Sequence, residues 1–266
     1  MASHTAALRV IQVSDCHLFK TEEGRLLGLN TAFSLEKVLE LVRAEQPAMD
    51  LILATGDLSQ DGSAESYRHF HEQIGRFGVP VYWLPGNHDL SDVMRNEKTA
   101  GEMSPCVVDT AGWRLILLDS TIRGKVPGRV SAEELDFLRT ALASAGDRHV
   151  LVALHHQPVP IGAAWLDEQK VGNADALWEV LDACPTLRAV IWGHVHQDFS
   201  TERKGVALMS VPSTCVQFAP NSVDFALDRQ NPGYRWLDLH PDGRVETGVS
   251  RVAGITFEID YRIKGY

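Results

Sequence analysis

Up to Gly193, short apolar runs alternate with longer segments whose apolar residues recur at helical spacing. Runs rich in Val, Ile and Leu predict buried strands, and they are Leu8–Val13, Leu51–Thr55, Val79–Leu84, Leu115–Leu118, Val150–Leu154 and Leu187–Trp192. The helical spacing predicts helices at Thr31–Glu45, Ala64–Phe77, Ala132–Ala145 and Ala174–Ala183. Alternation of this kind is typical of a layered α/β fold.

The pattern changes after Gly193, where apolar segments are shorter and are separated by Pro and Gly. The segments Val206–Val211, Val223–Ala226 and Tyr234–Leu239 predict antiparallel strands that close a second sheet. The chain shows no internal repeat, low-complexity tract or linker. We therefore predict one domain over residues 1–266, an α/β/β/α sandwich of four layers, with the chemical motifs in residues 15–196 and a β-rich part, 197–266, completing the second sheet.

Polar side chains follow five of the predicted strands. The segments are Asp15-Cys16-His17, Gly56-Asp57, Gly86-Asn87-His88-Asp89, His155-His156 and Gly193-His194-Val195-His196. Each segment alone is explained by a helix cap, a turn or a buried histidine. Ligands of open α/β sheets bind just beyond the carboxyl ends of the strands. Five such ends with metal-ligand side chains predict one shared site.

The chemistry of these side chains indicates the kind of metal. Carboxylate, amide and imidazole groups without thiolate fit Mn, Fe or Zn rather than a sulfur-bound structural zinc. The candidate ligands are Asp15, His17, Asp57, Asn87, His156, His194 and His196. Seven are too many for one tetrahedral ion, but they give four ligands to each of two ions if Asp57 bridges. Two metal ions side by side suit in-line displacement at phosphorus.

Charge and composition limit the classes of molecule that the protein is expected to bind. The 266 residues include 25 basic and 35 acidic ones, for a net charge of −10 and a pI near 5.5, which argues against a nucleic-acid partner. Two divalent ions would still make the small site locally positive and attractive to a phosphodiester monoanion. Four scattered cysteines, no signal peptide and no apolar run of membrane length predict a cytoplasmic protein with no membrane partner. Nothing in the residues sets the oligomeric state.

In their order along the chain, the five motifs resemble those of the calcineurin-like metallophosphoesterases. Within that family, further segments are similar to the bacterial class III 3′,5′-cyclic AMP phosphodiesterases, among them Leu27–Thr31, Gln60-Asp61, Trp83–Pro85, Leu117–Ser120, Trp165–Asp167 and Pro212–Phe218. The resemblance covers nearly the whole chain. It implies the metallo-dependent phosphatase fold, with two mixed sheets flanked by helices, and two bound ions, Fe or Mn. It also implies hydrolysis of cyclic AMP to 5′-AMP.

The resemblance also implies roles for single residues. Asp15, His17, Asp57 and His196 would hold one ion, and Asp57, Asn87, His156 and His194 the other. A metal-bound hydroxide would attack phosphorus, and His88, oriented by Asp89, would be the general acid. The substrate would contact His17, Asp57, Asn87, His88, His156 and His196. Trp165 would either stack on the adenine or anchor its own loop, and His155 would support the neighbouring ligand.

Two other interpretations stay open at the level of sequence. One is a metallophosphoesterase for another substrate, such as a 2′,3′-cyclic nucleotide, a glycerophosphodiester, a phosphoprotein or a nucleic acid. The other is a scaffold that binds metal or protein without catalysis. A scaffold is expected to have lost ligands or the acid, whereas all seven ligands and His88 are present.

Overall fold

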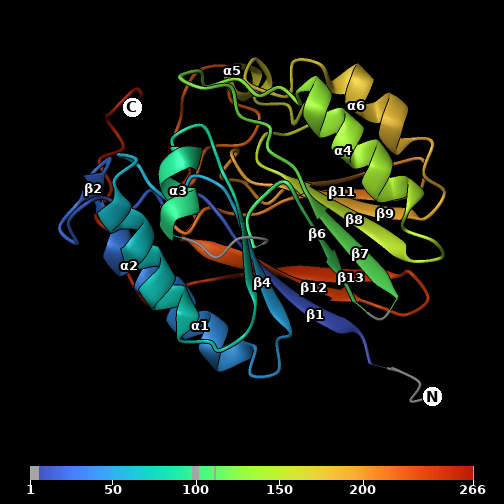
Figure 1. Cartoon of the computed structure of the whole chain (residues 1–266). Helices are drawn as coiled ribbons and strands as arrows, with labels where there is room; N and C mark the ends of the chain where they lie inside the picture. Colours follow the sequence, from blue (N-terminus) through green and yellow to red (C-terminus); the bar gives the residue numbers. More distant parts are fainter. Residues whose placement is uncertain (1–5, 98–101, 111, 266) are drawn as a thin grey trace.

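Two mixed β-sheets pack face to face in the computed structural model, which describes residues 6–97, 102–110 and 112–265 (Figure 1). The first sheet has the order β13-β12-β1-β4-β5, with β13 at Val245–Arg251, β12 at Gly233–Leu239, β1 at Leu8–Val13, β4 at Leu51–Thr55 and β5 at Val81–Leu84. The second has the order β10-β11-β9-β8-β7-β6, with β10 at Ser200–Arg203, β11 at Val206–Ser210, β9 at Leu187–Trp192, β8 at His149–Leu154, β7 at Trp113–Leu117 and β6 at Cys106–Asp109. A small hairpin joins β2, Arg25–Leu26, to β3, Leu29–Asn30.

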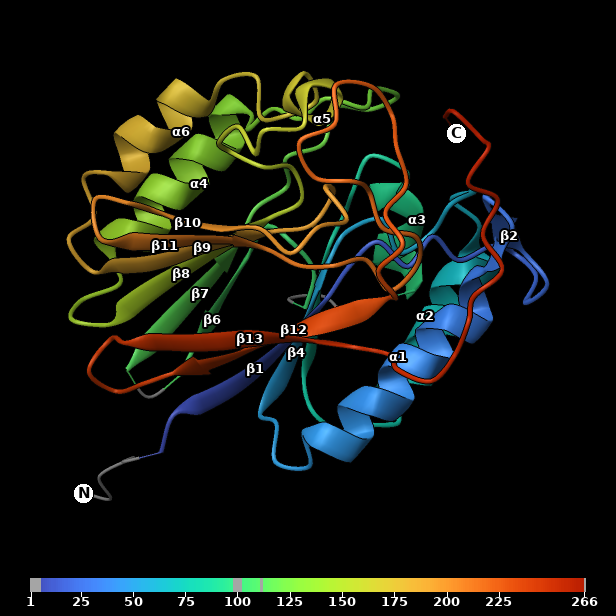
Figure 2. The ribbon, with the colours of Figure 1, turned by 180° about the vertical axis from the view of Figure 1, so that it is seen from behind.

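Helices cover the outer face of each sheet (Figure 2). On the side of the first sheet lie α1 at Thr31–Glu45, α2 at Ala64–Gly75 and α3 at Ser91–Glu97, and α1 contacts β12 and β13. On the side of the second lie α4 at Ala132–Ala143 and α6 at Ala174–Leu181, which contact each other, and the short α5 at Ala164–Asp167. The predicted α/β/β/α sandwich is confirmed.

Alternate residues of each central strand face different layers. In β4 all five residues are buried, because Leu51 and Leu53 pack between the sheets while Ile52 packs into the core beneath the helices. The same alternation in β8 puts Leu151 between the sheets. Full burial of each such side chain stabilises the fold by about 1.5–3 kcal/mol. Strands β1, β4 and β5 run parallel in the first sheet, and β8 and β9 run parallel in the second. The residues that follow these five strands meet at one common edge of the two sheets.

The C-terminal region departs from the sequence-based expectation. Strands β10 and β11 do extend the second sheet beside β9, but β12 and β13 extend the first sheet, where β12 pairs antiparallel with β1. The prediction that all of 197–266 completes the second sheet was therefore wrong for β12 and β13. The predicted strand Val223–Ala226 is loop. Its Phe225 packs instead against Trp165 and Phe218.

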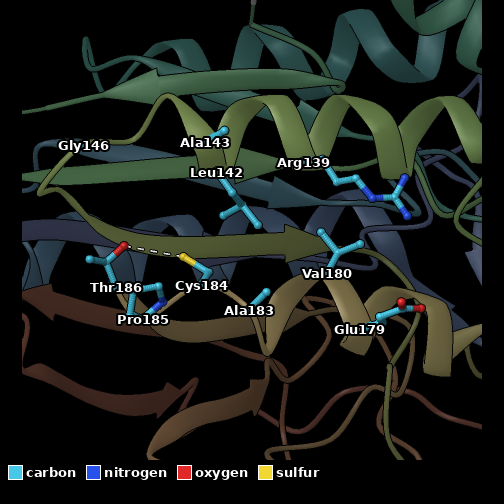
Figure 3. A pocket seen from close by; sticks show the side chains of 10 residues that line it. All are labelled: Arg139, Leu142, Ala143, Gly146, Glu179, Val180, Ala183, Cys184, Pro185 and Thr186. Carbon is cyan, nitrogen blue, oxygen red and sulfur yellow. Dashed lines mark hydrogen bonds between the residues drawn. The ribbon is translucent and has the colours of Figure 1, made fainter.

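One cavity lies away from this common edge. It has a volume of about 480 Å³ and lies between α4 and α6, with Leu142, Val180 and Cys184 in its wall (Figure 3). Cys184 precedes β9, whereas the predicted ligands His194 and His196 follow that strand. This cavity therefore belongs to the opposite end of the sheet. Among the described residues, no helix combines the length and the apolar character that a membrane crossing needs.

Candidate metal centre

The loops that follow β1 and β9 bring three predicted ligands together. The Nε2 atoms of His17 and His196 are 3.2 Å apart, and Nε2 of His196 is 3.3 Å from Oδ1 of Asp15. All three side chains are buried. Asp57 is adjacent, with its Oδ2 3.9 Å from Nε2 of His17. Oxygen and nitrogen atoms this close, in one buried pocket, form a candidate site for one cation.

A second group shares Asp57 with the first. Oδ2 of Asp57 is 3.4 Å from Nε2 of His155, and that nitrogen is 3.2 Å from Oδ1 of Asn87. His194 lies beside it, with its ring centroid 5.1 Å from that of His155. Asp57 therefore lies between two clusters, as expected for a bridging carboxylate.

The backbone at this edge is held in an uncommon conformation. Non-glycine residues seldom adopt positive φ, and five of the candidate ligands do so: Asp15 (55°), His17 (48°), Asp57 (49°), His194 (65°) and His196 (48°). Only three further non-glycine residues of the described chain, Leu27, Lys204 and Asn221, share this feature. Such strain costs about 1–3 kcal/mol per residue and persists where the surrounding fold imposes it, most often at functional sites.

Hydrogen bonds fix the tautomers of three histidines. Each of their Nδ1 atoms lies close to an oxygen that can only accept: Gln60 Oε1 for His17 at 2.7 Å, Thr55 O for His155 at 2.8 Å, and Val216 O for His196 at 2.8 Å. Nδ1 therefore carries a proton in each ring, and Nε2, which offers a lone pair when the ring is neutral, points into the cluster. Metal-binding histidines are oriented in this way.

His156 lies differently from its neighbour. Its Nδ1 accepts from Ser120 Oγ at 2.9 Å, and its Nε2 donates to the carbonyl of Val126 at 2.9 Å. Its nitrogen atoms belong to a group with His155 and His194, but no such group among the described residues joins His156 to a carboxylate. Burial and the charge of His155 lower the pKa of His156 to about 3, so its ring is neutral. The geometry therefore favours His155 over His156 as a ligand, and the sequence-based assignment of His156 stays a prediction.

Electrostatics at the centre favour added positive charge. Burial opposes the charged form of Asp57, but the charges of His155 and His88 outweigh it and hold the pKa of Asp57 well below its usual range. Burial likewise lowers the pKa of His155, yet the negative charge of Asp57 outweighs that effect and raises it to about 9. Burial lowers the pKa of His17 to about 3. The pKa values of Asp15 and Asp57 are lowered, so both are ionised, whereas burial keeps the rings of His17, His156 and His194 neutral. The two negative charges favour the binding of a cation.

These residues fit a pair of metal ions. The buried Nε2 of His194 has no hydrogen-bond partner among the described residues, and buried polar atoms are rarely left so. The Nε2 atoms of His17 and His196 face each other at 3.2 Å, an arrangement that a cation bound by both rings would satisfy. Imidazole, carboxylate and amide donors without thiolate match Mn, Fe or Zn.

Gly86 lets the loop after β5 approach Asp57. A Cβ atom at Gly86 would overlap Oδ1 and the backbone nitrogen of Asp57. That oxygen also accepts from the backbone N–H of His88 at 2.9 Å. A glycine is therefore needed here for space between two loops of the centre.

Gly86→Ala is expected to lower the free energy of unfolding by about 1–3 kcal/mol, because overpacking forces the two loops apart. Urea unfolding with a metal chelator present measures this without a contribution from metal. Gly75→Ala is the matched control, since a Cβ atom there meets only His71, at 3.9 Å. Alanine in a helix is favoured over glycine by about 0.5–1 kcal/mol, so the control should be unchanged or slightly stabilised. Equal stability of Gly86→Ala and wild type would contradict the close approach.

The predicted acid lies at the open side of the centre. His88 is half-buried, and its ring centroid is 5.1 Å from that of His17 in an edge-on arrangement. The carboxylate of Asp89 accepts from the backbone N–H groups of Leu58 at 3.2 Å, Ser59 at 3.0 Å and Gly86 at 2.9 Å. Burial and the charge of Asp57 raise the pKa of Asp89 to about 7, against the effect of these donors. Asp89 thus ties together the loops that carry Asp57 and His88.

Trp165 packs behind the ligands. Its ring meets Phe218 at 5.0 Å and Phe225 at 5.2 Å, and its Nε1 donates to Ser222 Oγ at 3.1 Å. Phe218 in turn stacks on His196, with 4.1 Å between centroids and 12° between planes. This arrangement matches the anchoring alternative, and adenine stacking by Trp165 stays a prediction.

Two side chains that support the centre had not been predicted individually from the sequence. Gln60 and Ser120 were noted only within longer similar segments, although each binds a histidine of the centre. Their signal in the sequence is weak, because a lone glutamine or serine in a loop has many ordinary roles.

The sequence is similar to one family of phosphoesterases and to named members of it. A model of the calcineurin-like phosphoesterase family matches residues 8–198. The 3′,5′-cyclic adenosine monophosphate phosphodiesterase CpdA of Pseudomonas aeruginosa is 51% identical over 261 residues, covering 98% of this chain and 96% of its own. The protein of the same name from Escherichia coli K12 is 42% identical over 263 residues, with the same coverage.

Solved structures share the fold at low identity. A dimetal phosphatase from Danio rerio has a TM-score of 0.66 and 15% identity, covering 93% of this chain and 100% of the other. The purple acid phosphatase PPD1 from yellow lupin has a TM-score of 0.69 and 14% identity, covering 98% of this chain and 55% of the other. At these identities the likeness shows the fold alone.

Proposed function

The chain belongs to the calcineurin-like phosphoesterase family, and from this premise we propose that it hydrolyses 3′,5′-cyclic AMP to 5′-AMP. The observation that carries the proposal is the pair of ligand clusters that share Asp57, with His88 at their open side. Relatives named for this activity align over 98% of the chain, which supports the choice of substrate.

We assign the ligands from the geometry of the two clusters. One ion would be held by Asp15, His17, Asp57 and His196, and the other by Asp57, Asn87, His155 and His194. This set has His155 in the place that the sequence prediction gave to His156. The physical reason is the direction of the imidazoles: Nε2 of His155 points to Asp57 and Asn87, whereas Nε2 of His156 points to the Val126 carbonyl. These donors fit Mn, Fe or Zn, and the resemblance to the family favours Fe or Mn.

The reaction is a displacement at phosphorus. When bound, two such ions supply Lewis acidity toward water and the phosphoryl oxygens. His88, at the open side, donates a proton to the departing 3′ oxygen, and positioned acid catalysis contributes typically about 10²–10⁴-fold. Asn87 precedes it and orients the phosphoryl group by its amide. Asp89 keeps the His88 loop in place through its three backbone contacts.

The cellular setting follows from the thiols and the substrate. All four cysteines are free: Cys16, Cys106, Cys184 and Cys215. Reduced thiols are typical of the cytoplasm, where we place the protein and where a cyclic nucleotide is available to it.

Turnover of cyclic AMP after reconstitution with Mn tests the proposal. The substrates compared are 3′,5′-cyclic AMP, 3′,5′-cyclic GMP, a 2′,3′-cyclic nucleotide and glycerophosphocholine. We expect 5′-AMP as product and a kcat/KM in the range of about 10⁴–10⁸ M⁻¹s⁻¹ that enzymes show for their own substrates. If kcat/KM is higher for the 2′,3′-cyclic nucleotide or for glycerophosphocholine than for cyclic AMP, that compound and not cyclic AMP is the preferred substrate. If the protein binds two ions but hydrolyses none of these substrates, the interpretation as a non-catalytic scaffold is favoured.

A further inference from the structure

A cavity of about 340 Å³ opens beside the proposed acid. It is bounded on one side by Asn87 and His88 with the start of α3, and on the other by the loop after β7, residues 121–124. Sites for small molecules have volumes of about 300–1,000 Å³ and usually combine apolar walls with a few polar groups. The cavity therefore has the size of a ligand site and directly adjoins the reacting groups.

The two walls carry exposed apolar side chains. Leu90 on the first wall is 44% exposed and Ile122 on the second is 37% exposed. One exposed aliphatic side chain is ordinary. Two that line the same cavity beside a reactive centre offer a surface for apolar contact with a ligand.

The second wall is held in place before any ligand arrives. The two ends of this loop are joined by a backbone hydrogen bond from the N–H of Arg129 to the carbonyl of Ser120, at 2.9 Å. A turn from Lys125 N to Ile122 O, also 2.9 Å, shapes its tip, and the Val126 carbonyl accepts from His156. A wall fixed in this way loses little entropy on binding. His156 thus anchors the loop that bears Ile122.

The direction of the reaction places the nucleoside on this side. The departing 3′ oxygen is part of the ribose, so the ribose must lie next to the group that protonates it, His88. The base is attached to the same ribose and extends into the space beyond. At the cavity rim the ion pair of Arg123 with Asp92, at 3.4 Å, is exposed on both sides and contributes little. The walls therefore offer the nucleobase mainly apolar contact, from Leu90 and Ile122.

We propose that the cavity between Leu90 and Ile122 binds the base of the cyclic nucleotide, and that these two side chains set the preference for nucleotides over base-free phosphodiesters. The inference rests on the proposed function, since it assigns a part of that substrate to this place. Leu90 and Ile122 lie on opposite walls, where each offers apolar contact to a planar base. The charged residues of the lining are Asp89, Asp92 and Arg123, of which Asp92 and Arg123 pair with each other.

Two kinds of measurement test the assignment, with Ile122→Ser and Leu90→Ser as variants. Val107→Ser, on β6, is the control, because Val107 has the same 37% exposure as Ile122 outside the cavity. The first measurement compares kcat/KM for cyclic AMP with that for methyl riboside 3′,5′-cyclic phosphate, which has the ring and no base. The second compares the equilibrium affinities of the Mn-loaded protein for 5′-AMP and for ribose 5-phosphate.

We expect the ratio of kcat/KM values to fall about tenfold in each cavity variant, mainly through KM, as for a lost apolar contact. The preference for 5′-AMP over ribose 5-phosphate should fall in parallel, and Val107→Ser should keep both ratios. Unchanged ratios in Ile122→Ser and Leu90→Ser would overturn the assignment, as would a wild type that does not distinguish the paired ligands. If wild type binds 5′-AMP selectively through these residues but leaves cyclic AMP intact, the proposed function fails and the cavity assignment stands.

Discussion

His88→Ala is expected to lower kcat for cyclic AMP by about 10²–10⁴-fold while two metal ions stay bound, because the variant loses the proton donor and no ligand. The alkoxide that leaves at the 3′ position is a poor leaving group without a proton. A p-nitrophenyl phosphodiester has a leaving group that departs as a stable anion, so its hydrolysis should fall much less. Steady-state kinetics on both substrates, with metal content by mass spectrometry, gives the result.

A second histidine provides the control for this experiment. His69, on α2, is half-buried and outside the centre, so His69→Ala should keep the kcat of wild type. Equal losses on the two substrates in His88→Ala would show that His88 holds the centre together instead of donating a proton. Wild-type kcat in that variant would remove His88 from the mechanism.

His155→Ala is expected to lose one of two bound ions and to reduce kcat/KM for cyclic AMP by about 100-fold or more, because removal of even an indirect metal partner typically costs 10–100-fold. His156→Ala should retain both ions. It removes the donor to the Val126 carbonyl, so the loop with Ile122 loses its anchor and the KM for cyclic AMP rises. Metal content and the division of the effect between kcat and KM separate these variants.

The opposite outcome is equally clear. If His156→Ala loses an ion and His155→Ala keeps both, the ligand set implied by resemblance holds and the geometric assignment is wrong. The two residues are neighbours of the same type and are both buried, so each variant is the matched control of the other.

Much of the fold follows from the apolar pattern. The bounds of β1, β4, β9 and α1 agree with the prediction, because each is a long periodic or apolar run between clear breakers. The edge strand β6 was missed, since its sequence, Cys106–Asp109, has only four residues, of which the last is charged. The placement of β12 beside β1 depends on pairing across more than two hundred residues, as in Leu8 with Leu239. Local patterns carry no information on such pairing.

The proposed choice of His155 over His156 uses the arrangement of the sheets, which the sequence-based assignment did not have. The alternation of β8 sends Leu151 and Ala153 toward the space between the sheets, and His155 has the same parity. The pattern contains the information, but its use requires knowing which face of the strand borders the other sheet. The cavity wall at residues 121–124 was not predicted for a related reason, because a loop becomes a wall only through what lies opposite.

The division of the centre between the two sheets has a consequence for the order of folding. Asp15, His17, Asp57 and Asn87 follow strands of one sheet, and His155, His194 and His196 follow strands of the other. His17 and His196, which meet at 3.2 Å, are 179 residues apart in the chain. Contacts this distant form only after the entropy of closing a long loop has been overcome by other interactions. Neither proposed ion could therefore nucleate the fold. Both ions would bind only after the two sheets have packed against each other.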